Sequence, residues 1–123
     1  MLYSRSPHEA YRRVDFDARV QGANPDELVR LCYEQLTGAL GTAIYAHERN
    51  DNRLKSQSLT RSLAAITALQ LGVDNTNEMS AALNQFYQAT RHAILDSALD
   101  FDPRTMSTVR QDFIDIAQAM GSS

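Results

Sequence analysis

The sequence predicts an all-α protein, an antiparallel up-and-down four-helix bundle with an additional short N-terminal helix. Apolar residues recur every three or four positions along four long stretches, and short polar turns separate these stretches. No stretch alternates apolar and polar residues as a half-buried strand does. Long helices that are joined by short turns pack as antiparallel neighbours. A chain of 123 residues is long enough for one sizeable core, so we expect a single bundle.

The three prolines mark helix starts, because each follows a residue that caps helices well and takes the first helical position. The pairs are Ser6-Pro7, Asn24-Pro25 and Asp102-Pro103. From the first pair we expect a short helix over about 7–19, with a thin apolar side formed by Ala10, Tyr11, Val14 and Ala18. Such a helix is marginal alone and must dock to persist. We therefore divide the chain into an N-terminal segment, 1–22, interpreted as a removable lid over a partner groove, and the bundle domain, 23–121.

The second predicted helix runs over about 25–49 and carries two apolar stripes. One stripe contains Leu28, Cys32, Leu36, Ala39 and Ala43, and the other contains Val29, Tyr33, Leu40 and Ile44. Together they cover more than half of the circumference, whereas a helix at the edge of a bundle needs a stripe about 100° wide. This helix is therefore central, or it offers a second apolar face to a partner. Gly38 and Gly41 would let a neighbouring backbone approach closely, or they simply weaken the helix.

Three further helices complete the predicted bundle. The third covers about 53–71, with the turn Asn50-Asp51-Asn52 as its cap and Gly72 as its C′ residue. The fourth covers about 76–99 behind an Asn75…Glu78 cap, and it aligns Met79, Leu83, Phe86, Thr90 and Ile94, flanked by Tyr87 and Leu95. The last covers about 103–120, where Met106, Val109, Phe113, Ile116 and Met120 recur with gaps of three and four residues. Phe113 and Val109 should thus lie in the bundle interior.

Charge and composition exclude several classes of partner and location. The chain carries 12 basic and 15 acidic residues, and its second half, 62–123, has 3 basic against 7 acidic residues. We therefore expect neither nucleic acid as a partner nor insertion into a membrane. The N-terminal residues lack the apolar stretch of a signal peptide, and no apolar run is long enough to span a bilayer, so we expect a cytoplasmic (cytosolic) location. The one cysteine, Cys32, excludes an intramolecular disulfide.

The sequence lacks the motifs of catalytic, cofactor and metal sites, so we predict that the protein is not an enzyme. Neither His47 nor His92 has a glutamate three residues before it, as a di-iron bundle requires. His8-Glu9 starts a zinc-protease motif, but no second histidine follows at the required spacing. Phosphotransfer through His92 stays open as a minor alternative; the more ordinary interpretation is a surface pair of His92 with Asp96. Cys32 is expected to be a small core residue.

Several short motifs follow one another across nearly the whole chain. They are Ala10-Tyr11, Ala23-Asn24-Pro25, Leu28 and Leu31-Cys32-Tyr33, then the turn Asn50-Asp51-Asn52, the corner Leu71-Gly72-Val73-Asp74, and Leu83 with Phe86-Tyr87. In order and spacing they resemble the pattern of the flagellar secretion chaperone family, FliS. The sequence departs from that pattern at Asn24, where Ser is usual, at Cys32, where Leu is common, at the start of the fourth helix, and in lacking a Trp near the end of the last helix.

The resemblance implies a cytoplasmic export chaperone that has no enzymatic activity and no cofactor. Members of this family bind the C-terminal segment of flagellin, prevent its premature polymerisation and deliver it to the flagellar export apparatus. A disordered apolar segment can fold as a helix onto a bundle, which agrees with this role. The predicted partner-binding residues lie at stripe edges or in the family pattern: Tyr11, Val14, Leu28, Val29, Leu31, Tyr33, Leu83 and Tyr87. The main alternative is a generic helical adaptor or homodimerisation module. Docking on the export gate and a homodimer in the free state are left open.

Overall fold

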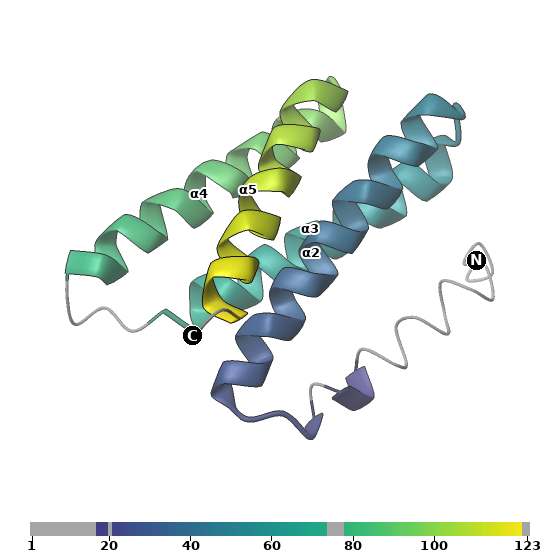
Figure 1. Ribbon diagram of the computed structural model, residues 1–123. Helices are drawn as coiled ribbons and strands as arrows, with labels where there is room; N and C mark the ends of the chain where they lie inside the picture. Colours follow the sequence, from purple (N-terminus) through teal and green to yellow (C-terminus); the bar gives the residue numbers. More distant parts are fainter. Residues whose placement is uncertain (1–16, 20, 74–77, 122–123) are drawn as a thin grey trace.

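The computed structural model is a helical bundle that describes residues 17–19, 21–73 and 78–121. Its helices are α2 (Pro25–Glu48), α3 (Asn52–Leu71), α4 (Glu78–Leu99) and α5 (Pro103–Gly121) (Figure 1). α2 packs against α3 and α5, and α4 completes the ring because it also contacts both α3 and α5. Successive helices run in opposite directions (Figure 1). The predicted antiparallel four-helix bundle is confirmed.

The end of the predicted N-terminal helix is also helical. Asp17, Ala18 and Arg19 adopt helical conformation, and the chain turns at Gly22 shortly before α2 begins. The rest of that helix, with its predicted cap at Ser6-Pro7, lies outside the described residues.

Two of the three helix caps predicted from the prolines are confirmed. At the start of α2, Asn24 Oδ1 accepts a hydrogen bond of 2.9 Å from the backbone N–H of Glu27. At the start of α5, Asp102 accepts from the backbone N–H of Arg104 at 3.0 Å and from the hydroxyl of Thr105 at 2.9 Å. These hydrogen bonds, that from Thr105 more than that from Arg104, favour the charged carboxylate and so lower the pKa of Asp102.

The turn between α2 and α3 ends one helix and caps the next. Asn50 has a left-handed backbone with φ of 58°, and the N–H groups of Asn50 and Asp51 donate to the carbonyls of His47 (3.1 Å) and Ala46 (2.8 Å). This is a Schellman ending of α2, in which Asn50 takes the place that glycine usually holds. The carboxylate of Asp51 then caps α3 by accepting from the N–H of Leu54 at 3.0 Å. The polar turn predicted as a cap is confirmed.

Gly72 ends α3 as predicted, but not with the left-handed backbone that a C′ glycine adopts. Its φ is −86°, and its N–H donates to the carbonyls of Ala68 and Leu69 at 3.1 and 3.2 Å. Any residue can adopt this conformation, so the freedom of glycine is not needed here. The predicted Asn75…Glu78 cap of α4 lies across 74–77, outside the described residues.

α2 lies at the centre of the core, and both of its predicted stripes are buried along most of its length. Leu36 and Leu40 have no exposed surface, and Tyr33 is 2% exposed. The alternative of a second apolar face towards a partner is wrong for this stretch, because α3 covers one side of α2 and α5 covers another. The first turns differ, since Leu28 is half-buried and Val29 is 36% exposed.

α5 supplies two fully buried side chains to the core. Met106 and Phe113 have no exposed surface, which confirms Phe113 as an interior residue. Val109 and Ile116 are half-buried and pack against the edge of the core. The predicted apolar side of the last helix is therefore correct, and only part of it is fully covered.

The neighbour of Gly41 on α2 is a side chain of α5 and not the helix backbone that the sequence suggested. A Cβ atom on Gly41 would lie 3.0 Å from Arg110 Nε, which donates a hydrogen bond of 2.9 Å to the carbonyl of Thr37. A Cβ atom on Gly38 would meet nothing within 4 Å. Gly41 therefore makes room for an arginine contact between α2 and α5, whereas Gly38 only weakens the helix.

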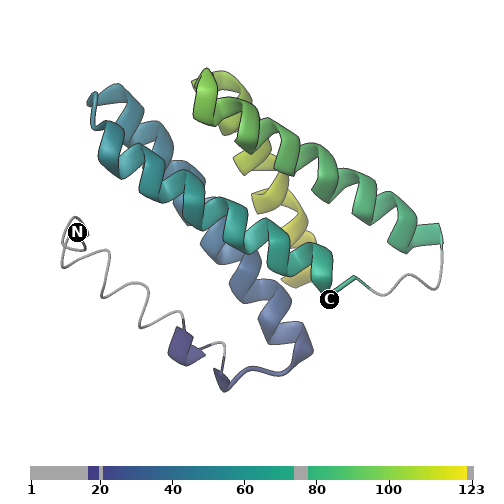
Figure 2. The ribbon, with the colours of Figure 1, turned by 180° about the vertical axis from the view of Figure 1, so that it is seen from behind.

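α4 and α5 lie close together at the turn that joins them and diverge towards their other ends (Figures 1 and 2). Phe101 lies in this turn and contacts the other two helices. Its ring stacks on His47 of α2 with a centroid distance of 4.5 Å, and the centroid lies 5.2 Å from Lys55 Nζ of α3. The contact between α4 and α5 is the least extensive of the four neighbouring helix pairs, and that between α2 and α3 is the most extensive. The contact between α4 and α5 is thus the weakest side of the bundle.

Candidate partner-binding surface

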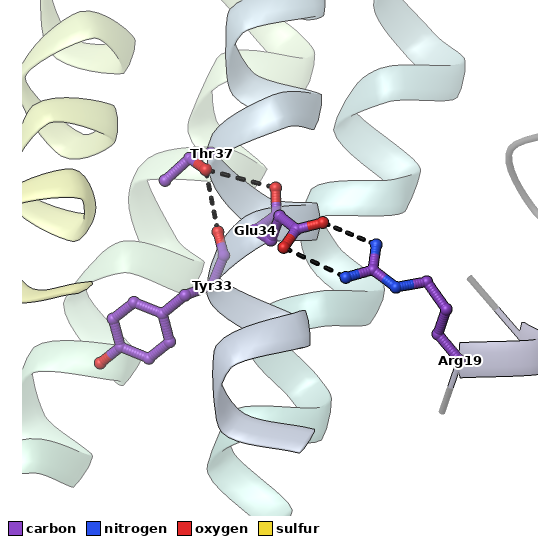
Figure 3. Close-up of polar contacts among 4 residues, drawn as sticks. All are labelled: Arg19, Tyr33, Glu34 and Thr37. Atoms are coloured by element: carbon purple, nitrogen blue, oxygen red, sulfur yellow. Dashed lines mark hydrogen bonds and ion pairs between the residues drawn. The ribbon is translucent and has the colours of Figure 1, made fainter. Parts of the chain in front are cut away.

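An ion pair attaches the N-terminal segment to the outer side of α2. Arg19 Nη1 lies 2.7 Å from Glu34 Oε1, and Nη2 lies 3.4 Å from Oε2 (Figure 3). The side chains are 46% and 62% exposed, so screening by solvent limits the pair to about 0.2–1 kcal/mol. In Figure 3 the ring of neighbouring Tyr33 points away from this pair, and the Thr37 hydroxyl donates to the carbonyls of Tyr33 and Glu34. This ion pair by itself therefore contributes little to holding the segment on α2.

A hollow of about 440 Å³ lies between the N-terminal segment and the start of α2. Its lining comes from Ala18, Arg19 and Gly22 on one side and from Glu27, Arg30, Leu31 and Glu34 on the other. Two arginines and two glutamates surround a small apolar area that contains Leu31. Charged groups of both signs thus lie beside a little apolar surface in this hollow.

The structure divides the predicted partner-binding residues by their exposure. Leu28 and Val29 are partly exposed, Leu83 is half-buried against the core, and Leu31, Tyr33 and Tyr87 are buried. Tyr11 and Val14 lie outside the described residues. A partner can reach the first turn of α2 directly, whereas contact with either buried tyrosine requires the core to open.

Tyr33 of α2 and Tyr87 of α4 meet in the core through their hydroxyl groups, which lie 2.8 Å apart. Their rings pack with Phe86 and Phe113; the Tyr33–Phe113 and Phe86–Phe113 centroid distances are 5.1 and 4.9 Å. Burial raises the pKa of both phenols above the ordinary value. The hydroxyls therefore stay protonated at neutral pH and join α2 to α4 across the bundle.

Cys32 and His92 were considered for reactivity, and the surroundings of both favour a structural role. Burial raises the pKa of the Cys32 thiol, which disfavours the nucleophilic thiolate. The amide nitrogen of Gln88 donates to His92 Nε2 at 3.0 Å, and Gln88 Oε1 accepts from Gln70 at 2.8 Å. His92 thus joins a chain of hydrogen bonds between α3 and α4, and the predicted pair with Asp96 is wrong. Within the described ranges, no three His, Cys, Asp or Glu side chains form a group that could hold a metal ion.

Among the described residues, the most exposed large apolar side chains were not predicted as candidates. Leu71, Met79 and Leu99 are 83%, 74% and 92% exposed. Met79 was expected on the buried side of the fourth helix, but it lies in the first turns of α4, where this helix diverges from α5 (Figure 1). One signal could have indicated this region: the stretch 79–90 has no charged residue at all, although a fully solvated helix face is usually charged.

A family model described as flagellar protein FliS matches residues 7–120, which is nearly the whole chain. The chain belongs to the FliS family. The resemblance seen in the sequence motifs is confirmed, and FliS membership supports a role as a flagellar chaperone. A search of the curated proteins found no match. None of the FliS-family helices that the structure describes is long and apolar enough to cross a membrane.

Proposed function

We propose that this FliS-family chain is a cytosolic export chaperone that binds the C-terminal segment of flagellin, keeps flagellin from polymerising prematurely and delivers it to the flagellar export apparatus. The family match over residues 7–120 carries this proposal. A helical bundle with exposed apolar side chains offers a physical basis for it, because a disordered segment can fold against such a surface. Coupled folding of this kind buries about 1,000–3,000 Å² and so offsets the cost of ordering the segment.

In this proposal, the first contacts with flagellin form at the start of α2. Leu28 and Val29 are partly exposed there, and the hollow beside them contains Leu31. Tyr11 and Val14, the predicted residues of the N-terminal segment, remain part of the proposed set of contacts. The buried or half-buried members of the predicted set, Tyr33, Leu83 and Tyr87, lie in the core or pack against it.

The N-terminal segment, 1–22, acts as a lid in this proposal. The exposed Arg19–Glu34 pair supports the idea, since an ion pair that is open to solvent costs a competing partner little to replace. A tethered lid competes with a partner at an effective concentration of order millimolar. Deletion of residues 1–19 should therefore tighten the binding of a flagellin peptide in calorimetric titrations. If hydrogen exchange of residues 8–20 slows when the peptide binds, the segment is a clamp and the lid is wrong.

Flagellin assembly tests the function itself. An equimolar amount of the chain should block flagellin polymerisation in a light-scattering assay, and a C-terminal flagellin peptide should gain helicity in circular dichroism on binding. Val29→Gln should weaken this binding, whereas the matched control Glu48→Gln, at the other end of α2, should leave it unchanged. A chain that binds other helical proteins but not flagellin would favour the generic adaptor and contradict the proposal.

A further inference from the structure

The methionine side chains of the described ranges differ in their exposure. Met106 of α5 has no exposed surface and belongs to the core. Met120, in the last turn of α5, is half-buried and packs against the core. Met79 lies in the first turn of α4 and is 74% exposed. Of these three thioethers, that of Met79 is therefore the one that small reagents in solution reach freely.

A thioether that is open to solvent reacts with peroxides. A lone pair of the methionine sulfur attacks one oxygen atom of hydrogen peroxide, and the O–O bond breaks. The hydroxide that leaves takes the proton from the transferred oxygen and becomes water. The sulfur is thus oxidised by two electrons to the sulfoxide, and the peroxide is reduced. Because the rate depends on exposure, Met79 should react before Met106 and Met120.

Cys32 carries another sulfur that a peroxide can oxidise, and its surroundings protect it. Its side chain is 7% exposed, and burial raises the pKa of the thiol. Peroxides oxidise the thiolate, which is the nucleophilic form, so a buried thiol with a raised pKa reacts slowly. Among the sulfur atoms that the structure describes, oxidation is thus directed to Met79.

We propose that Met79 is a reversible oxidation site, at which a peroxide converts the thioether to the sulfoxide and a methionine sulfoxide reductase restores it. In the return step the sulfoxide oxygen leaves as water while two thiols of the reductase form a disulfide. The reductase has to reach the sulfoxide, which the exposed position in the first turn of α4 allows. This property goes beyond flagellin binding and does not depend on it.

Oxidation of Met79 changes the surface of α4 without disturbing the core. The sulfoxide is polar, and at Met79 its oxygen stays in water, so no buried polar group is created. The same change at Met106 would place a polar oxygen in the core, which disrupts its packing. Met79 can therefore be oxidised and restored while the bundle remains folded, and each oxidation removes an exposed apolar group from the start of α4.

Oxidation rates compared within one molecule test the proposal. The folded full-length chain is treated with hydrogen peroxide and digested with trypsin, which places Met79 (62–91), Met106 (105–110) and Met120 (111–123) in separate peptides for mass spectrometry. Met79 should be oxidised about tenfold faster than the other two, and urea should abolish the difference. Circular dichroism should give the same denaturation midpoint before and after oxidation of Met79. Treatment of the folded, oxidised chain with methionine sulfoxide reductase and a dithiol should restore Met79.

Two variants check the assignment to Met79. Met79→Leu keeps an apolar side chain of similar size and should eliminate the fast oxidation of peptide 62–91, whereas the matched control Met120→Leu should leave the rate at Met79 unchanged. Equal rates at Met79 and Met106 in the folded chain, or earlier oxidation of Cys32, would overturn the proposal. So would a lower denaturation midpoint after oxidation of Met79 alone, or failure of the reductase to restore it. Because the rates are compared within the wild-type chain, the result does not depend on the folding of a variant.

Discussion

Alanine substitutions at the two glycines of α2 test the contact between α2 and α5. In a helix interior, Gly→Ala raises stability by about 0.8–1 kcal/mol, because alanine loses less backbone entropy on folding. A Cβ atom on Gly38 meets nothing within 4 Å. Gly38→Ala should therefore raise the free energy of unfolding by about 0.8–1 kcal/mol.

Gly41→Ala has the same gain in helix propensity but displaces Arg110. The new Cβ atom would lie 3.0 Å from Arg110 Nε and 3.4 Å from its Cζ, so the guanidinium has to move. A shift of a few tenths of an ångström relieves the contact and lengthens the 2.9 Å hydrogen bond to the carbonyl of Thr37. A hydrogen bond from a charged donor contributes about 1.5–3 kcal/mol, so its weakening offsets part or all of the gain in helix propensity, and Gly41→Ala should stabilise the protein less than Gly38→Ala does.

Urea denaturation followed by circular dichroism measures both effects. The matched background is Arg110→Met, which keeps an apolar side chain of similar length and removes the guanidinium. In that background Gly41→Ala should recover the stabilisation of about 0.8–1 kcal/mol, and the difference between backgrounds is the coupling energy of Gly41 with Arg110. Equal stabilisation by Gly38→Ala and Gly41→Ala in the wild-type background would refute the position of Arg110 over α2.

Three further predictions concern the core. Phe113→Ala should cost about 3–5 kcal/mol because the ring is fully buried, and an unchanged denaturation midpoint would show that the apolar side of α5 is misplaced. Among the residues that the structure describes, the buried hydroxyl of Ser58 has no hydrogen-bond partner, so Ser58→Ala should raise the free energy of unfolding by about 1 kcal/mol in calorimetric melts; a loss of stability would reveal a partner. Burial raises the folded-state pKa of Tyr33 and Tyr87, so their contribution to stability is complete below the unfolded phenol value of about 10 and is lost as the pH rises above it. Denaturation midpoints measured against pH should show this alkaline decline in the wild type and a smaller one in Tyr33→Phe/Tyr87→Phe.

The helix boundaries were predictable because local interactions determine them. Asn24 and Asp102 cap their helices through contacts within three residues, and a proline follows each of them in the sequence. The ending of α2 is also local, but the sequence did not show which residue would be left-handed. Asn50 took that conformation, and Gly72 did not. Glycine and asparagine both tolerate a left-handed backbone, so composition alone does not decide which of them uses it.

The candidate site was less predictable than the fold. Tyr33 and Tyr87 belong to the motifs that resemble the FliS pattern, yet their hydroxyl groups pair in the core, 54 positions apart in the chain. Met79 continues the apolar side of α4 in sequence but is exposed in space. An apolar stripe in the sequence shows that one face of a helix is apolar. It does not show whether a neighbouring helix covers that face at each turn.

The sequence by itself determined the all-α class, the starts of α2, α3 and α5, and the interior position of Phe113, because each depends on residues that are close in the chain. It also carried the FliS-family pattern. Only the tertiary structure decided that α3 and α5 bury most of both stripes of α2, and that Met79 at the start of α4 stays exposed. These features depend on how helices distant in sequence are placed, which the packing of the whole core sets and no local pattern encodes.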